Sequence, residues 1–206
     1  MSDEPLKTGA SERSAQISRK TNETSITVKL NLDGSGTTEI STGVGFFDHM
    51  LEQLGRHAGF DLEVTAEGDL QIDSHHTVED AGLVLGAVLT EALGEKRGIR
   101  RYGAATVPME EALVRAALDL SGRPLLAYEV PVPAEAIGNY DPDLTEEFFM
   151  ALTRAAGMTL HIKLLAGKNS HHIVEAVFKA VAQALLSAVE INPRAAGRIP
   201  STKGIL

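Results

Sequence analysis

The sequence predicts an α+β fold built by internal duplication of a β-β-α-β-β-α-like unit, with two sheets and packed helix layers. The first observation is a repeated hexapeptide, since SHHTVE at residues 74–79 returns as SHHIVE at residues 170–175. The second is that alternating apolar residues, typical of half-buried strands, precede both copies, and each copy opens a helical apolar pattern. The third is a Phe-Phe pair that opens another helical segment in each half.

The chain is expected to form one domain with four parts. Residues 1–15 are polar and are expected to be a flexible segment. Residues 16–98 and 99–193 form the two repeat halves, and residues 194–206 form a C-terminal tail. At 206 residues the chain is long enough to bury a substantial core.

The strands of the first half are predicted to form two hairpins. Apolar residues alternate over 26–32, and the turn sequence DGSG leads to a partner strand at 37–42. A second hairpin is expected to pair residues 62–64 with residues 70–72.

Two helices are predicted in the same half. The first covers residues 46–56. The second runs from His75 to Leu93, with Ser74 as its N-cap and Gly94 ending it.

The second half is predicted to repeat this order after a join at residues 98–107. Glu147 lies at the start of a helix that echoes the first Phe-Phe helix, and Ser170 is the predicted N-cap of the last one. His161 is expected in the core. The predicted strands are 113–120, 125–130 and 159–165, and the last helix is 171–189.

Composition limits the classes of protein that this chain can be. A net charge of −9 argues against nucleic-acid binding. The chain has no cysteine, which excludes disulfides and thiolate metal sites and leaves imidazole and carboxylate as ligands. The N-terminus does not resemble a signal peptide, and no apolar run approaches the ~20 residues of a membrane span. We therefore expect a soluble, cytoplasmic protein that binds neither membranes nor nucleic acid.

The repeated His-His-x-x-Glu motif is the strongest candidate for chemistry. His75 and Glu79 are four residues apart and share a helix face, whereas the adjacent His76 points about 100° away. Each histidine of a pair is therefore expected to serve a different metal ion, which predicts two sites that draw ligands from both halves. A pair of solvated cap histidines is the alternative, and the recurrence of the motif argues against it.

Other residues are candidates for metal or anion binding. His49 follows the first Phe-Phe pair, and its counterpart near the second pair is Glu147. Arg101, Arg123 and Lys179 could bind an anion, although each alone is more often a solvated charge. The tail at residues 201–203 could close over a phosphate.

Six segments of the chain carry a resemblance to a known family, and they are FDHML (47–51), SHHTVED (74–80), KRGIRRYG (96–103), DLSGRP (119–124), NSHHIVE (169–175) and PSTKG (200–204). On these segments the chain resembles the imidazoleglycerol-phosphate dehydratases, which are manganese enzymes of histidine biosynthesis. The resemblance extends in order from Arg19 to the C-terminus.

The resemblance implies dehydration of imidazole glycerol phosphate to imidazole acetol phosphate with two Mn ions per subunit. Glu23 would be an acid–base group, with His49 and Glu175 also in the catalytic set. The metal ligands would be His49, His75, His76, Glu79, Glu147, His171, His172 and Glu175. The substrate and its phosphate would be bound by Gln53, His57, Arg101, Arg123, Lys179, Ser201, Thr202 and Lys203.

The resemblance also implies assembly and marks one departure. Relatives form a large hollow homo-oligomer of 24 chains, with active sites between subunits. Many carry histidine where this chain has Glu147. Two rival functions remain open at this point, a non-catalytic metal-binding cage protein and a dinuclear metallohydrolase. The cage protein would need no phosphate-binding arginines, and the hydrolase would use more bridging carboxylates.

Overall fold

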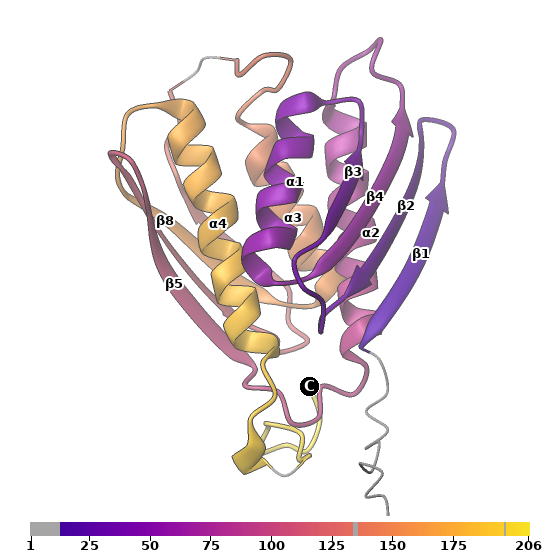
Figure 1. Ribbon diagram of the computed structural model, residues 1–206, viewed down its shortest axis with the longest axis vertical. Coiled ribbons are helices and arrows are strands. Elements are labelled where there is room, and N and C mark those ends of the chain that lie inside the picture. Colours follow the sequence, from indigo (N-terminus) through magenta and orange to yellow (C-terminus); the bar gives the residue numbers. More distant parts are fainter. Residues whose placement is uncertain (1–12, 134–135, 196) are drawn as a thin grey trace, which may run out of the picture.

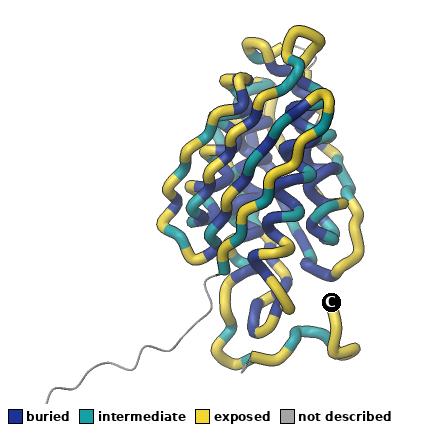
Figure 2. Tube along the Cα trace, turned by 90° about the vertical axis from the view of Figure 1, so that its right-hand side faces the viewer, coloured by how far each residue is buried: buried dark blue, intermediate teal, exposed yellow. Residues whose placement is uncertain are grey.

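Four helices lie between two four-stranded sheets in the computed structural model, which describes residues 13–133, 136–195 and 197–206 (Figure 1). The α+β class and the internal duplication are therefore confirmed. The inner faces of both sheets and the helices between them supply the core, while exposed residues gather in the loops at both ends of the molecule (Figure 2).

The first half forms one sheet and two helices. Its strands are β1 (Ser14–Lys20), β2 (Thr24–Asn31), β3 (Thr38–Ser41) and β4 (Asp61–Gly68), in the order β1-β2-β4-β3. Only the β3–β4 pair is parallel. The helices are α1 (Gly45–Ala58) and α2 (His75–Leu93).

The second half repeats this topology. Its strands are β5 (Tyr102–Met109), β6 (Ala112–Asp119), β7 (Leu125–Glu129) and β8 (Thr159–Ala166), in the order β5-β6-β8-β7. The helices are α3 (Leu144–Ala156) and α4 (Ser170–Val189), and a 3-10 turn (Pro193–Ala195) follows.

The predicted hairpin pairings are wrong. Strand β3 does not pair with β2 but lies parallel to β4, which itself pairs with β2. This arrangement aligns buried Val28 and Leu30 with Val64 and Leu62 in one apolar face. Residues 70–72 form no strand, and Ile72 is 66% exposed.

Two strands were missing from the sequence prediction. Strand β1 begins at Ser14, inside the segment expected to be flexible, and β5 occupies much of the expected join at 98–107. Both are edge strands with few buried residues, so their apolar alternation is weak. The prediction for residues 1–12 lies outside the described part of the chain.

The long helices begin and end close to their predicted limits. Helix α2 covers the predicted residues, and the Gly94 amide closes it on Thr90 and Glu91. Ser74 holds the N-cap position of α2 without a side-chain bond, and Asn169 rather than Ser170 caps α4 by accepting from the His172 amide. Ser170 instead donates to the Pro133 carbonyl at 3.1 Å.

Helix packing pairs the halves crosswise, because α1 packs on α4 and α3 packs on α2. Helices α2 and α3 approach closely at Gly82 and Gly86. A Cβ at either glycine would come within 2.6 Å of a backbone oxygen of α3. Helix α4 is apolar and long enough to cross a membrane by composition, but 72% of its apolar window is buried inside this fold.

Candidate active site

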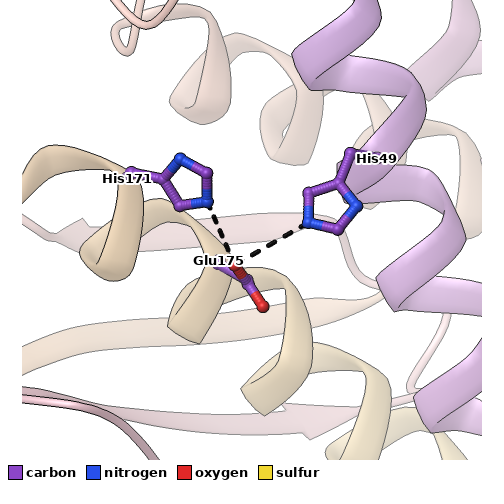
Figure 3. A group of neighbouring side chains, drawn as sticks. All are labelled: His49, His171 and Glu175. Carbon is purple, nitrogen blue, oxygen red and sulfur yellow. Dashed lines mark hydrogen bonds and ion pairs between the residues drawn. The ribbon is translucent and has the colours of Figure 1, made fainter.

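Crosswise packing brings three potential metal ligands together from both halves of the chain. His49 projects from α1, and His171 and Glu175 lie one turn apart on α4 (Figure 3). The Glu175 carboxylate is 3.2 Å from His171 Nε2 and 3.8 Å from His49 Nε2. All three ligand atoms lie within 4.8 Å of one another.

This cluster suits a divalent metal ion. An ion held at about 2.0–2.2 Å from nitrogen and oxygen ligands keeps those ligands roughly 3–4 Å apart, which is the spacing of the Glu175 carboxylate from each of the two histidines. Two imidazoles and one carboxylate suit Mn, Fe, Co or Zn. Among residues 13–133, 136–195 and 197–206, no other three such groups meet this closely.

Lys179 sets the electrostatics of the cluster. Its ammonium lies 2.5 Å from Glu175, whose side chain is only 7% exposed. Burial opposes ionisation of Glu175, but the hydrogen bond and charge of Lys179 outweigh it and lower the pKa of the carboxyl. Burial and the same lysine also lower the pKa of His57, which bonds Gln53 at 3.1 Å. Gln53, His57 and Lys179 thus lie beside the three ligands.

The first-half motif is more open. His75 Nε2 lies 3.7 Å from Glu79, and the two side chains are 42% and 38% exposed. Glu147 lies on α3, which packs on α2 as α1 packs on α4, so it occupies the position equivalent to His49. The described side chains do not form a three-ligand group around Glu147.

The second histidine of each motif has a different carboxylate partner from the first, which lies near the motif glutamate. The ring planes of the two histidines differ by 90° in the first motif and 83° in the second. His76 Nδ1 lies 3.0 Å from Asp69, and His172 Nδ1 lies 2.7 Å from Glu111. Sequence reasoning missed both carboxylates. The position of Glu111 was a usable signal, because it directly precedes β6 as Glu23 directly precedes β2.

Hydrogen bonding shifts the pKa of two of these groups. The His172 ring and backbone amides of residues 168 and 169 lower the pKa of Glu111 to about 2. The bond to Asp69 raises the pKa of His76. Asp69 and Glu111 are thus well placed to accept a hydrogen bond from a protonated Nδ1 of His76 and His172.

Glu23 lies near the first motif on a turn that is fixed at several points. The Thr21 hydroxyl accepts the amides of Glu23 and Thr24, and the Thr24 hydroxyl donates to buried Asp80 on α2. The Glu23 side chain is 56% exposed, and its nearer oxygen is 4.0 Å from His76 Nδ1. The backbone is therefore held while the carboxylate faces solvent.

The remaining predicted anion-binding residues gather elsewhere. The Arg101 guanidinium binds both Asp119 oxygens, at 2.6 and 3.0 Å, and donates to the Pro200 carbonyl at 2.9 Å. Arg123, 68% exposed, lies 3.9 Å from the same Asp119. Because Pro200 precedes Ser201, Thr202 and Lys203, Arg101 brings the tail to this group.

The predicted site residues therefore divide between the two ends of α4. The Arg101 amide bonds the Ala188 carbonyl, near the C-terminal end of α4, whereas His171 lies in its first turn. At about 1.5 Å of rise per residue these positions are roughly 25 Å apart. His161 takes part in neither group. It is exposed on β8 between buried Leu160 and Ile162, so its expected core position is wrong.

Comparison with known proteins identifies the family. Residues 42–185 match the family model described as imidazoleglycerol-phosphate dehydratase. The chain belongs to this family. It is 61% identical over 194 residues to an imidazoleglycerol-phosphate dehydratase of Cereibacter sphaeroides, covering 94% of this chain and 100% of the relative. A relative from Acidiphilium cryptum is 60% identical over 94% of this chain and 99% of its own length.

Solved structures of the family share this fold. The dehydratase of Pyrococcus furiosus superposes with a TM-score of 0.80 at 38% identity, covering 92% of this chain and 100% of that one. The Staphylococcus aureus enzyme gives a TM-score of 0.79 at 38% identity, covering 87% and 99%. The duplicated arrangement of sheets and helices is thus a property of the dehydratase family.

Proposed function

We propose that this chain dehydrates imidazole glycerol phosphate to imidazole acetol phosphate in histidine biosynthesis, in the cytoplasm, with two Mn ions per chain. The observation that carries the proposal is the His49–His171–Glu175 cluster in a chain of the dehydratase family. The reaction itself follows from family membership over nearly the whole chain.

The chain offers ligands for two ions. His49, His171 and Glu175 would hold one of them. His75, Glu79 and Glu147, which are their counterparts under the duplication, would hold the other. His76 and His172, which contact Asp69 and Glu111 instead, would complete sites across a subunit boundary. A bound metal supplies Lewis acidity and orients the substrate.

The dehydration needs a base and an acid. One C–H bond and the neighbouring C–O bond break, water leaves, and the resulting enol becomes a ketone when its carbon is protonated. Glu23 is suited to the proton transfers because its turn is anchored while its carboxylate is exposed. Lys179 keeps Glu175 ionised, which suits a ligand role for Glu175.

Substrate binding would use groups at both ends of α4. Gln53, His57 and Lys179 lie beside the metal cluster, where they can contact the substrate. Arg101, Arg123, Ser201, Thr202 and Lys203 form the basic and hydroxyl-rich group that suits a phosphate. Arg101 would orient this group through Asp119 and Pro200.

The distance between these ends supports self-association. A substrate with a three-carbon chain cannot span roughly 25 Å, so the phosphate-binding residues of one chain cannot serve the metal cluster of the same chain. A second copy would supply the missing end. We therefore propose a homo-oligomer with sites shared between subunits, for which the family resemblance suggests 24 chains.

Turnover with defined metal content tests the proposed function. Protein purified with Mn should convert imidazole glycerol phosphate to the acetol phosphate. Chelator-treated protein should be inactive and should recover when Mn is restored. Tight metal binding without turnover of this substrate would favour the cage-protein alternative and overturn the proposed enzyme function.

Light scattering tests the proposed assembly. If ions bind groups from neighbouring chains, they stabilise the assembled form by mass action. Metal-free protein should then be a smaller species than Mn-loaded protein with two ions per chain. An assembly of unchanged size after chelation would show that these ligands do not control association.

A further inference from the structure

The second histidine of each motif is bound at Nδ1 by a carboxylate that lies outside the motif. Asp69 approaches His76 Nδ1 with both oxygens, at 3.2 and 3.0 Å. Glu111 Oε2 lies 2.7 Å from His172 Nδ1. Asp69 follows β4, whereas Glu111 lies in the β5–β6 turn, so unrelated positions in the two halves make the same contact.

The carboxylate that binds the second histidine occupies a different position in the duplicated topology of each half. Glu23 and Glu111 are equivalent, since each directly precedes the second strand of its sheet. The residue equivalent to Asp69, directly after β8, is Gly167, which has no side chain to offer. In the second half the turn glutamate therefore binds the histidine, and in the first half Asp69 does so instead.

We infer that Asp69 and Glu111 are positioning residues that fix His76 and His172 in the Nδ1–H tautomer and leave Nε2 as the metal-binding nitrogen. An imidazole that donates through Nδ1 has its only lone pair on Nε2, and the hydrogen bond also fixes the orientation of the ring. The inference rests on the proposed metal sites.

Asp69 also explains why Glu23 is available for proton transfer. Glu111 is occupied by three donors, namely His172 Nδ1 at 2.7 Å and the amides of Asn169 and Lys168 at 2.8 and 3.3 Å. Glu23 remains 4.0 Å from His76, because Asp69 already binds that ring. The acid–base role therefore falls to the turn glutamate whose histidine is bound by another residue.

The variant Glu111→Gln separates positioning from a structural role. Two carboxylate oxygens serve the three donors at Glu111, and glutamine has only one oxygen. If that oxygen stays with the two backbone amides, the glutamine NH2 faces His172 Nδ1. The ring must then accept at Nδ1 and carry its proton on Nε2, where it blocks the metal. If Glu111 only supports the fold, Glu111→Gln should weaken Mn binding less than Glu111→Ala does. If Glu111 positions the His172 ring, Glu111→Gln should weaken Mn binding at least as much as Glu111→Ala.

The experiment reads the tautomer and the metal affinity separately. Nitrogen NMR of 15N-histidine-labelled, metal-free protein should show His76 and His172 as Nδ1–H. A pH of about 8.5, some two units above the ordinary imidazole pKa of about 6.5, leaves room for the raised pKa of His76. His76→Ala and His172→Ala assign the two signals. Glu111→Gln should shift His172 to Nε2–H and weaken Mn binding by roughly 10–100-fold in chelator competition. Glu110→Gln, which removes the same charge from the same turn, is the matched control and should change neither.

Two results would overturn the inference. One is a His172 ring that stays Nδ1–H in Glu111→Gln, and the other is Mn binding equal to that of the unaltered protein. The proposed function fails separately, through Mn-loaded protein that does not turn over imidazole glycerol phosphate. The NMR result on metal-free protein does not depend on that outcome.

Discussion

In the second half of the chain, Glu175 is 7% exposed and lies between His171, His49 and Lys179, whereas its first-half counterpart Glu79 is 38% exposed and lies near His75. Both histidines and the glutamate of the motif are the same in the two halves. The difference comes from the neighbours, because Leu83 stands where Lys179 would be expected and Glu147 stands where His49 would be expected.

This contrast shows that duplicated ligands do not make duplicated sites. Around Glu175, an opposite charge offsets burial and two imidazoles converge within one chain. Around Glu79, His75 is the imidazole partner, and both side chains are more exposed. We therefore expect the second-half cluster to bind its metal ion more tightly. We expect metal binding by the first-half group to depend more on residues of neighbouring chains.

The largest expected effect distinguishes the two motif glutamates. Glu175→Gln should remove the tighter class of Mn site and lower kcat by roughly 10³-fold, since a catalytic metal contributes several kcal/mol to the transition state. Glu79→Gln should weaken the other site and leave the tighter class intact. Metal content after gel filtration and steady-state kinetics measure both, with thermal unfolding as a check on folding. Equal loss of the tighter class in both variants would refute the comparison.

The second-largest effect is expected at Glu23, in the turn that precedes β2. Glu23→Gln should lower kcat by roughly 10²-fold or more while metal content stays at two ions per chain, because Glu23 is not predicted to be a ligand. Glu67→Gln, an exposed carboxylate on β4, serves as the control. An unchanged kcat would remove Glu23 from the mechanism.

A smaller effect is expected when the two sites are made alike. Glu147→His gives the first-half group the imidazole that His49 gives the second. Because imidazole favours Zn over Mn more than a carboxylate does, the ratio of Zn to Mn affinity at this site should rise several-fold. Competition titrations in a Glu175→Gln background isolate the site. A ratio that does not change would show that Glu147 is not a ligand.

The smallest expected effect compares the hydrogen bonds made by Asp61, the first residue of β4, with those made by Thr159, the first residue of β8. Amides of Ser35 and Thr37 bond to Asp61 and lower its pKa. The equivalent residue Thr159 donates its hydroxyl to the Arg123 carbonyl at 3.0 Å. Asp61→Ala should cost about 1 kcal/mol at neutral pH, a Tm decrease of about 2–4 °C for a chain of this size.

The loss of Tm caused by Asp61→Ala should depend on pH, whereas the loss caused by Thr159→Val should not. A lowered pKa stabilises the fold above the unfolded-state value of about 3.9, and this stabilisation is lost as pH falls through the folded-state pKa. The Tm difference between Asp61→Ala and the unaltered protein should therefore shrink below about pH 4. For Thr159→Val, which lacks a titrating group, the difference should stay constant. A constant difference for Asp61→Ala would contradict the assigned pKa shift.

The sequence by itself determined the helices, the fold class and the family. Helix α2 could be predicted because its apolar spacing and the terminal glycine are local signals, readable within one turn. The duplication could be predicted because a six-residue motif recurs at the start of a long helix in each half. The Phe-Phe pairs are not equivalent, since they occupy the second and third positions of α1 but the fifth and sixth of α3. The metal-binding residue types were predicted from the same motif, since ligand chemistry depends on side-chain identity.

Only the tertiary structure decided which strands pair and which residues meet. The β3–β4 pairing arises because β4 takes the place beside β2 and extends a shared buried face, which local alternation does not encode. His49 reaches His171 only because α1 packs on α4, and Asp69 and Glu111 reach their histidines from loops with no common motif. The roughly 25 Å length of α4 between His171 and Ala188 separates the proposed metal ligands from the proposed phosphate-binding residues. Contacts of this kind between distant segments depend on packing, which no local pattern records.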